Sequence, residues 1–277
     1  MIDLHTHTTA SDGRHEPSML VARAAAAHVT VLAVTDHDTV AGCEAARTAA
    51  EASGIAFVNG IEVTAVVNGA DVHVLGYFVE TTSPDLLAFL TEQRRHRAER
   101  VREIVQRLAA HGVVLDAEEI LEPGLADSGK APGRPWVARA LVAAGHVSSA
   151  DEAFDTWLER GRPGFVPRIG ASPADVFARI HAAAGVASLA HPGLVRHDEW
   201  LPAFREAGLD ALEAYHPSHD AWATKRYLAL ARELGLAVSG GSDYHGDESH
   251  GPGGPGSVSL PRAEFERLAR VKVDKGY

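Results

Sequence analysis

The amino-acid sequence predicts an α/β fold with mostly parallel strands and one helical insertion. Short runs rich in β-branched residues alternate with stretches rich in alanine and leucine, which is typical of parallel α/β folds. The chain of 277 residues is long enough for one large barrel domain, or for a core domain that carries a smaller one. The alternation stops over residues 83–164, where helical patterns follow one another.

Seven segments have the composition of strands. Each is a short and mainly apolar run that is bounded by polar or turn-forming residues. We expect strands over residues 2–5, 29–35, 56–63, 73–78, 186–190, 211–215 and 237–240.

Start and stop signals mark several of the helices between these strands. Pro17 fits the first turn of a helix over residues 17–28. Ser172 and Pro173 form the N-cap and first position of a second helix, which Gly185 ends. A third helix is expected over residues 219–234.

Residues 83–164 contain helical patterns and no convincing strand. Apolar residues recur at helical spacing over residues 84–110, and Asp116 and Ser149 begin sequences that resemble capping boxes. We therefore divide the chain into a discontinuous core domain, residues 1–82 and 165–277, and an insertion, residues 83–164. We expect the insertion to cap the active site.

The composition excludes several classes of partner. A formal net charge of −11 argues against binding to duplex nucleic acid, although bound cations would neutralise part of this charge. We find no signal peptide and no apolar stretch long enough to span a membrane. The single cysteine, Cys43, fits a reducing compartment, and we expect it to be a buried helix residue. We expect a cytoplasmic protein without a membrane partner.

Candidate metal ligands accompany every predicted strand. The chain contains 16 histidines, and in a parallel barrel the carboxyl ends of the strands gather on one face, where active sites form. His73 begins its strand, so that strand is antiparallel or His73 lies on the preceding turn. The candidates are His5, His7, Asp12, His37, Glu62, His73, His191, Asp243 and His245, with His216 and His219 after the sixth strand.

These residue types predict a hydrolytic metal centre. Imidazoles with carboxylates suit zinc, manganese or iron, whereas the absence of cysteine clusters argues against structural zinc and iron–sulfur sites. His5 and His7 lie two residues apart, which places both rings on one face of an extended strand. A carboxylate such as Glu62 can bridge two cations, and paired cations can activate water and stabilise both oxygens at a reacting phosphorus. We therefore expect hydrolysis of a phosphate ester.

At these residues the sequence resembles the PHP (polymerase and histidinol phosphatase) family of metal-dependent phosphoesterases. The resemblance implies a distorted (β/α)7 barrel with a trinuclear centre. The matching strings are Asp-Leu-His-Thr-His at 3–7, Ser-Asp-Gly at 11–13, Thr-Asp-His-Asp at 35–38, Gly-Ile-Glu at 60–62, Asp-Val-His at 71–73, Ala-His-Pro at 190–192 and Gly-Ser-Asp-Tyr-His at 241–245.

The resemblance also implies how the ligands are shared among the ions. Manganese is expected first, with zinc, iron or magnesium as alternatives, and two or three ions are expected. Some family members have a histidine in place of Asp12, which leaves the occupancy and metal preference of the third site open. Asp36 is expected to orient a histidine. The implied sets are His5, His7, Glu62 and Asp243; then Glu62, His73 and His191; then Asp12, His37 and His245.

Three further strings, at 133–140, 161–167 and 213–219, resemble one subgroup of the family. Its members remove phosphate from 3′,5′-bisphosphorylated nucleotides or trim short RNA from the 5′ end. The resemblance implies a nucleotide or a short oligonucleotide as substrate. Arg134 suits phosphate binding, and His216 is the candidate proton donor to the leaving oxygen. The expected substrate contacts are Arg134, His216, His219, Lys130 and Arg162, of which Arg134 and His216 are also expected to be catalytic.

Two alternatives remain at this point. The first is a phosphatase for a metabolite that is not a nucleotide, such as histidinol phosphate. The second is a metal-binding module without catalysis. The complete set of ligands favours an enzyme, and the insertion favours a nucleotide substrate. The sequence leaves the oligomeric state open.

Overall fold

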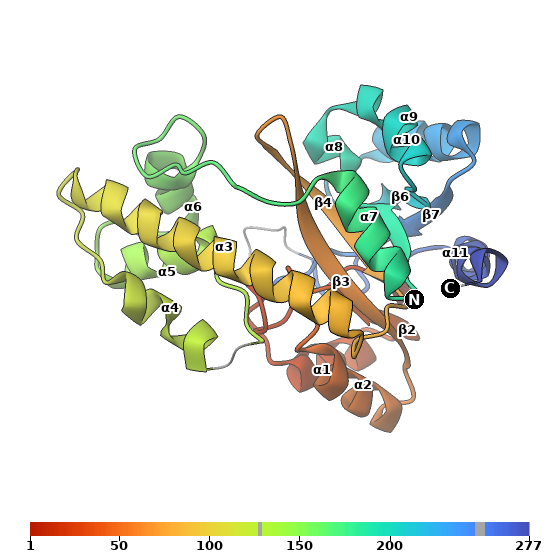
Figure 1. The fold of residues 1–277 in the computed structure, drawn as a ribbon. Helices are drawn as coiled ribbons and strands as arrows, with labels where there is room; N and C mark the ends of the chain where they lie inside the picture. The colour runs from red at the N-terminus through yellow and green to blue at the C-terminus, as the bar shows by residue number, and fades with distance from the viewer. Residues whose placement is uncertain (127–128, 247–252, 277) are drawn as a thin grey trace.

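The computed structural model describes residues 1–126, 129–246 and 253–276. Its strands form one sheet in chain order, parallel from β1 to β3 and from β5 to β7, with β4 antiparallel to both of its neighbours (Figure 1). The strands are β1 (Ile2–Asp3), β2 (Val31–Val34), β3 (Ala56–Val67), β4 (Ala70–Tyr77), β5 (Val186–Leu189), β6 (Ala211–Tyr215) and β7 (Ala237–Gly240).

The sheet curls into a nearly closed barrel because its two edges meet. The Leu4 amide donates a hydrogen bond to the Gly240 carbonyl at 3.2 Å, and Thr6 forms a parallel bridge with Tyr244. Gly241 is required at this seam, since a Cβ there would lie 2.3 Å from the backbone nitrogen of His5. The seven-stranded barrel expected from the sequence is confirmed.

The β3–β4 hairpin departs from the predicted strand bounds. Both strands extend further than predicted, to a turn at Asn68 and Gly69 with φ of 50° and 76°. Glu62 therefore lies in the middle of β3, and the predicted bounds of residues 56–63, which place it at the carboxyl end of a strand, are wrong. Since β4 is antiparallel, its first half lies beside the carboxyl end of β5, and the Ala190 amide donates to the His73 carbonyl. This resolves the two alternatives for His73 in favour of an antiparallel strand.

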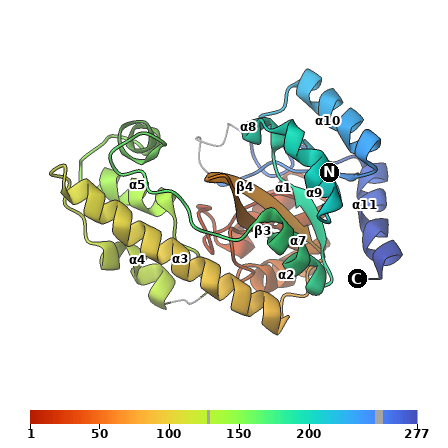
Figure 2. The same cartoon turned by 45° about the horizontal axis from the view of Figure 1, so that its top comes forward.

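Helices surround the barrel (Figure 2). Several of them begin and end at the predicted signals. The Ser172 hydroxyl accepts from the Asp175 amide, and Gly235, with φ of 63°, ends α10. Asp220, and not His219, caps the start of α10. The last helix, α11, was not predicted. These helices are α1 (Pro17–Ala26), α2 (Cys43–Ala52), α7 (Pro173–Ala182), α8 (Pro192–Val195), α9 (Leu201–Glu206), α10 (Ala221–Leu234) and α11 (Arg262–Lys275), with a short 3₁₀ turn at Asp198–Trp200.

A helical segment lies between β4 and β5 and projects to one side of the barrel, on the left of Figure 1. The Asp116 carboxylate accepts from the Glu118 amide at 2.8 Å and the Ser149 hydroxyl from the Glu152 amide at 3.1 Å, so both predicted caps are confirmed. The helices are α3 (Pro84–Ala109), α4 (Ala117–Ala126), α5 (Arg134–Ala143), α6 (Ala150–Ala153) and a π-helical turn at Phe154–Leu158.

This segment has its own hydrophobic cluster, but α3 belongs to two clusters. The second half of α3 buries Ile104 and Leu108 against α4 and α5, together with Leu121 and Leu141. The first half buries Leu86 and Leu90 in the main cluster, which fills the space between the sheet and α7. One continuous helix therefore ties the helical segment to the barrel. No helix among the described residues is long and apolar enough to cross a membrane.

Candidate metal centre

All nine predicted ligands gather at one end of the barrel. Together with His216, most of them fall into overlapping groups whose ligand atoms lie within 4.8 Å of one another. His191 joins through Glu62, because its Nε2 lies 3.2 Å from that carboxylate. The groups are His7, Asp12, His37 and His245; His5, His216 and Asp243; His5, His7 and Glu62; and His37, Glu62 and His73. The arrangement could hold more than one divalent ion.

The backbone at the strand ends is held in unusual conformations. His191 has φ of 28°, Asp243 has φ of 50° and Asp38 has φ of 51°, all in the left-handed region that residues with a Cβ seldom adopt. Such conformations are typical of functional sites, where the surrounding structure holds them in place.

Glu62 occupies the middle of the cluster, and its two oxygens face different histidines. Oε2 lies 3.3 Å from Nε2 of His7 and 3.0 Å from Nδ1 of His37. Oε1 lies 2.9 Å from Nδ1 of His73 and 3.2 Å from Nε2 of His191. A carboxylate that divides its oxygens in this way has the geometry of a bridging ligand between two ions.

His7 faces two further carboxylates besides Glu62. Its Nε2 lies 3.3 Å from Oδ1 of Asp243, and its Nδ1 lies 3.7 Å from Oδ1 of Asp12. Asp12 in turn lies 3.4 Å from Nε2 of His245 and 3.6 Å from Nε2 of His37. The residues expected at the third site therefore lie beside those expected at the first.

Unpaired ring nitrogens test whether these residues fit a metal ion. Most buried polar atoms in proteins have a hydrogen-bond partner, and each exception needs an explanation. Here several nitrogens face carboxylates without the geometry of a hydrogen bond, which is how two ligands of one ion are placed. The orphaned nitrogens are Nε2 of His5, both nitrogens of His7, and Nδ1 of His37, His73 and His191. This donor set fits divalent metal ions.

The charges of the cluster are strongly coupled. Burial lowers the pKa of His7, but the nearby carboxylates of Asp243 and Glu62 outweigh burial and raise it to about 10. Burial acts to raise the pKa of Glu62, yet His37 and His73 hold that pKa well below the usual range. The metal-free protein therefore holds ionised carboxylates beside a protonated His7. A cation that binds to these ligands displaces the proton of the histidine.

Glu213 was missed as part of the centre. It is fully buried in β6, accepts a hydrogen bond from Nδ1 of His5 at 2.9 Å and another from the His191 amide at 2.6 Å. The bond to Nδ1 leaves Nε2 of His5 to face Glu62 and Asp243. Such carboxylate–histidine pairs fix the tautomer and orientation of a metal ligand.

Asp36 acts differently from the prediction. Its carboxylate accepts from the Thr8 amide and hydroxyl and from the Ser11 hydroxyl, at 2.6–2.7 Å. It thus holds the loop that carries Asp12, and the prediction that it orients a histidine is wrong. Cys43 is buried at the start of α2, as predicted, and burial raises the pKa of its thiol to about 12.

His216 and His219 follow β6 but make different contacts. The Ser218 amide donates to Nδ1 of His216, and Nε2 of His216 lies 3.3 Å from Oδ2 of Asp243. Nε2 of His219 accepts from the Gly193 amide, and its Nδ1 donates to the Ala214 carbonyl. His216 therefore faces the cluster, whereas His219 fastens two strand ends to each other. Their roles toward a substrate stay predictions.

Arg134 lies in a cluster of four arginines with two aspartates. Asp71, two residues before His73, lies 3.8 Å from Nη2 of Arg134 and 3.4 Å from Nε of Arg168. Arg100 reaches the same carboxylate at 3.9 Å, and Arg97 and Arg168 pair with Asp38. Burial and the Arg97 charge lower the pKa of Arg168 to about 10. Four guanidinium groups share two carboxylates, so this arginine cluster carries an excess of positive charge.

Lys130 and Arg162 are the other two predicted substrate contacts. The residues next to Lys130 are tied to the barrel, since the Ala131 amide donates to the Ala10 carbonyl and the Thr39 hydroxyl to the Gly129 carbonyl. Arg162 is exposed after the π-helical turn, and no contact among the described residues joins its side chain to the histidines. Both roles stay predictions.

Comparison with known proteins agrees with a metal-dependent phosphoesterase site. Residues 3–118 match the model of the PHP domain. The chain is 35% identical over 253 residues to the 5′-3′ exoribonuclease Rnm of Escherichia coli K12, a match that covers 88% of this chain and 84% of that protein. It is 34% identical over 251 residues to a 3′,5′-nucleoside bisphosphate phosphatase of Chromobacterium violaceum, covering 88% and 87%.

A solved structure has the same fold throughout. It is a protein of Bifidobacterium adolescentis described as a metal-dependent phosphoesterase, with a TM-score of 0.87 and 31% identity. The match covers 97% of this chain and 95% of that one. Coverage this complete includes the helical segment between β4 and β5 as well as the barrel.

Proposed function

The chain belongs to the PHP-domain family of metal-dependent phosphoesterases and is a hydrolase, and we propose that it cleaves a phosphate ester on a nucleotide that carries a second phosphate. The substrate is a 3′,5′-bisphosphorylated nucleotide, a short RNA with a 5′-phosphate, or both. Relatives named for each reaction support this proposal. The alternative of a module without catalysis is set aside.

The single observation that carries the substrate proposal is the arginine cluster beside the histidines. Arg134 and Arg168 meet at Asp71, and the chain from Asp71 to His73 leads directly into the candidate metal centre. A phosphate that does not react would find its counter-charge there while the reacting phosphate lies at the histidines. Guanidinium groups suit this role because they bind phosphate through two parallel hydrogen bonds.

The candidate ligands form three sets, one for each of three ions. We propose that His5, His7, Glu62 and Asp243 hold one ion, Glu62, His73 and His191 a second, and Asp12, His37 and His245 a third, with manganese the first ion to test. When bound, such cations supply Lewis-acid chemistry, polarising the phosphoryl group and making water more acidic.

The remaining groups position charges and protons. Glu62 faces each histidine set with a different oxygen, and Glu213 keeps Nε2 of His5 turned toward the centre. Nε2 of His216, next to Asp243, is placed to pass a proton to the leaving oxygen. We also infer that the helical segment caps this face and restricts the substrates that reach it.

A hydrolysis assay that follows both inorganic phosphate and the nucleotide products tests the proposal. The protein loaded with manganese is given adenosine 3′,5′-bisphosphate, a 5′-phosphorylated dinucleotide, adenosine 5′-monophosphate, a cyclic phosphodiester and histidinol phosphate. We expect kcat/KM to be highest for one of the first two, and chelation to abolish it. Activity on histidinol phosphate with none on the nucleotides would overturn the proposal in favour of the metabolite phosphatase. Activity that survives complete removal of metal would contradict the assignment of the centre.

A further inference from the structure

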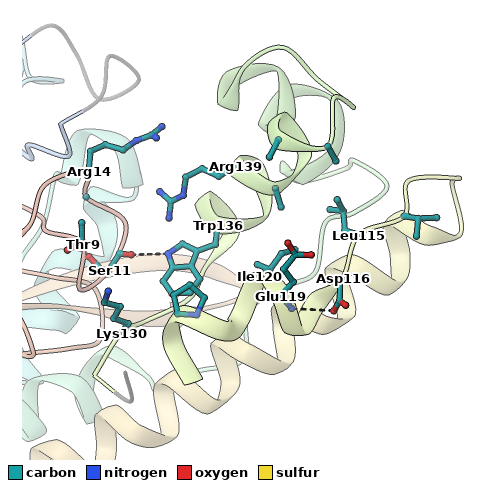
Figure 3. Close-up of a pocket in the computed structure, with 16 residues that line it drawn as sticks. Thr9, Ser11, Arg14, Leu115, Asp116, Glu119, Ile120, Lys130, Trp136 and Arg139 are labelled. Atoms are coloured by element: carbon teal, nitrogen blue, oxygen red, sulfur yellow. Dashed lines mark hydrogen bonds between the residues drawn. The ribbon is translucent and has the colours of Figure 1, made fainter. Parts of the chain in front are cut away.

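A cavity of about 680 Å³ lies between the loop after β1 and the helices α4 and α5 (Figure 3). This volume falls within the range of sites for small molecules and cofactors, about 300–1,000 Å³. Neither the histidines of the metal centre nor the arginine cluster line the cavity, so the proposed reaction assigns it no role. Residues that line it include Thr9, Ser11, Gly13, Arg14, Lys130 and Arg139.

The cavity directly adjoins the candidate metal centre. Ser11 and Gly13 line it, and the residue between them is Asp12, whose carboxylate faces His37 and His245. Two bonds fix α5 to the same loop. The Trp136 indole donates to the Ser11 carbonyl at 2.9 Å, and the Arg139 guanidinium donates to the Asp12 carbonyl at 3.4 Å. The candidate metal centre and the cavity are therefore bounded by the same short loop, residues 11–13.

The two ends of the cavity differ in chemistry. In Figure 3 the cationic side chains of Arg14, Lys130 and Arg139 lie near the loop of the barrel, at the end close to the metal centre. The far end is lined by Leu115 and Ile120 together with the exposed acidic residues Asp116 and Glu119, and Trp136 lies between the two ends. Cations followed by an apolar and aromatic wall suit a phosphorylated heterocycle, whose phosphate needs counter-charge and whose base needs an apolar surface.

We propose that this cavity binds the second nucleotide of a short 5′-phosphorylated oligonucleotide. The proposal rests on the proposed function. The 5′-phosphate of the first nucleotide would lie at the arginine cluster, the phosphate between the nucleotides at the histidines, and the second nucleoside in the cavity. The arginine cluster and the cavity use different residues, so both can be filled by one substrate.

One bond cleavage then accounts for both kinds of substrate. A water oxygen bonds to phosphorus, the bond from phosphorus to the 3′ oxygen of the first nucleotide breaks, and that oxygen takes a proton. In a 3′,5′-bisphosphate the attacked phosphorus carries nothing further, and inorganic phosphate is released. In an oligonucleotide it carries the second nucleotide, which leaves with a new 5′-phosphate and can be the next substrate.

The test fills the cavity without touching either charged cluster. Ala140, half-buried on α5, lines the cavity, and its replacement by Phe would occupy space meant for the second nucleoside. We expect Ala140→Phe to lower kcat/KM for a 5′-phosphorylated dinucleotide about 10-fold or more, and to change kcat/KM for adenosine 3′,5′-bisphosphate less than about 2-fold. Ala143→Phe, at an exposed position on the cavity rim, should give the same pattern without disturbing packed residues.

A matched control and a binding measurement complete the test. Ala109→Phe, at an exposed position on α3 outside the cavity, should leave both substrates unaffected. In metal-free protein with chelator present, the dinucleotide should bind more tightly than adenosine 5′-monophosphate, and Ala140→Phe should remove the difference. Equal losses on both substrates, no loss on either, or no difference in binding would overturn the cavity proposal. Wild-type protein that cleaves neither substrate would overturn the proposed function instead, while the binding measurement would still decide the cavity.

Discussion

The barrel end and the helical segment contribute opposite charges to one site. All nine candidate ligands stand on loops and strands of the barrel, where carboxylates crowd around the histidines. Most of the arginines and the lysine stand on the helical segment, and their surplus charge is positive. The barrel thus suits cations, and the helical segment suits the anion that those cations attract. Loss of a barrel residue should stop the reaction, whereas loss of a helical-segment residue should change which substrate is preferred.

The sharpest test on the barrel side is Glu62→Gln. The substitution keeps the shape of the side chain but removes the charge that both histidine sets face, so we expect turnover to fall by about 10³-fold or more. Metal content measured on the purified protein should fall as well, while the circular dichroism spectrum is unchanged. Glu80→Gln, at an exposed position beyond β4, is the matched control. Normal metal content and turnover in Glu62→Gln would refute the bridging role.

Glu213→Gln should have a smaller effect on the same side. The amide can still contact Nδ1 of His5 but no longer favours the tautomer that turns Nε2 toward the centre. We expect the affinity for manganese to fall about 10- to 100-fold, measured by titration of the metal-free protein. High metal concentration should restore most of the turnover. A loss of turnover that metal does not restore would mean that Glu213 acts in the reaction itself.

The pH dependence of metal binding also tests the barrel side. Because the pKa of His7 is raised to about 10 in the metal-free protein, this histidine holds a proton at neutral pH, and an ion must displace it. Affinity should therefore rise as the pH rises toward 10, by up to about 10-fold per pH unit for each proton displaced. Calorimetry in buffers with different heats of ionisation counts these protons. Binding without proton release would contradict the prediction.

Arg134→Ala tests the helical segment, with the smallest expected effect. If Arg134 binds the phosphate that does not react, KM for adenosine 3′,5′-bisphosphate should rise about 10-fold, or about 1.4 kcal/mol, with little change in kcat. A phosphomonoester without a second phosphate should be indifferent to the change. The control is Arg102→Ala, an exposed arginine on α3 paired with Glu118. Equal losses on both substrates would mean that Arg134 binds the phosphate that reacts.

The sequence predicted the ligands better than it predicted the contacts between them. His5, His37 and His191 follow apolar runs that end at the same face of the barrel, so their meeting could be foreseen. The shape of the β3–β4 hairpin could not, because the turn at Asn68 and Gly69 sits between two runs that could also have paired elsewhere.

Glu213 and Arg168 show why some residues of the site could not be identified, or were not identified, from the sequence. Arg168 lies in a loop without periodicity, and only the folded chain brings it to Asp38 and Asp71. Glu213 did carry a signal, since a carboxylate in the middle of the apolar strand β6 costs free energy unless a buried partner meets it. That buried partner is His5, which lies in the strand predicted over residues 2–5.

The shared helix α3 has a consequence for the history and engineering of this molecule. Its first half fills the barrel core with Leu86 and Leu90, so excising the helical segment would not leave a smaller working barrel. It would leave two leucine-sized holes, at a cost of about 2–5 kcal/mol each, which is comparable to the whole stability of many domains. Any ancestor or truncated variant without the segment must therefore have kept this half-helix or refilled its place. The part of α3 up to about Leu90 is structurally barrel, whatever the chemistry of the residues that follow it.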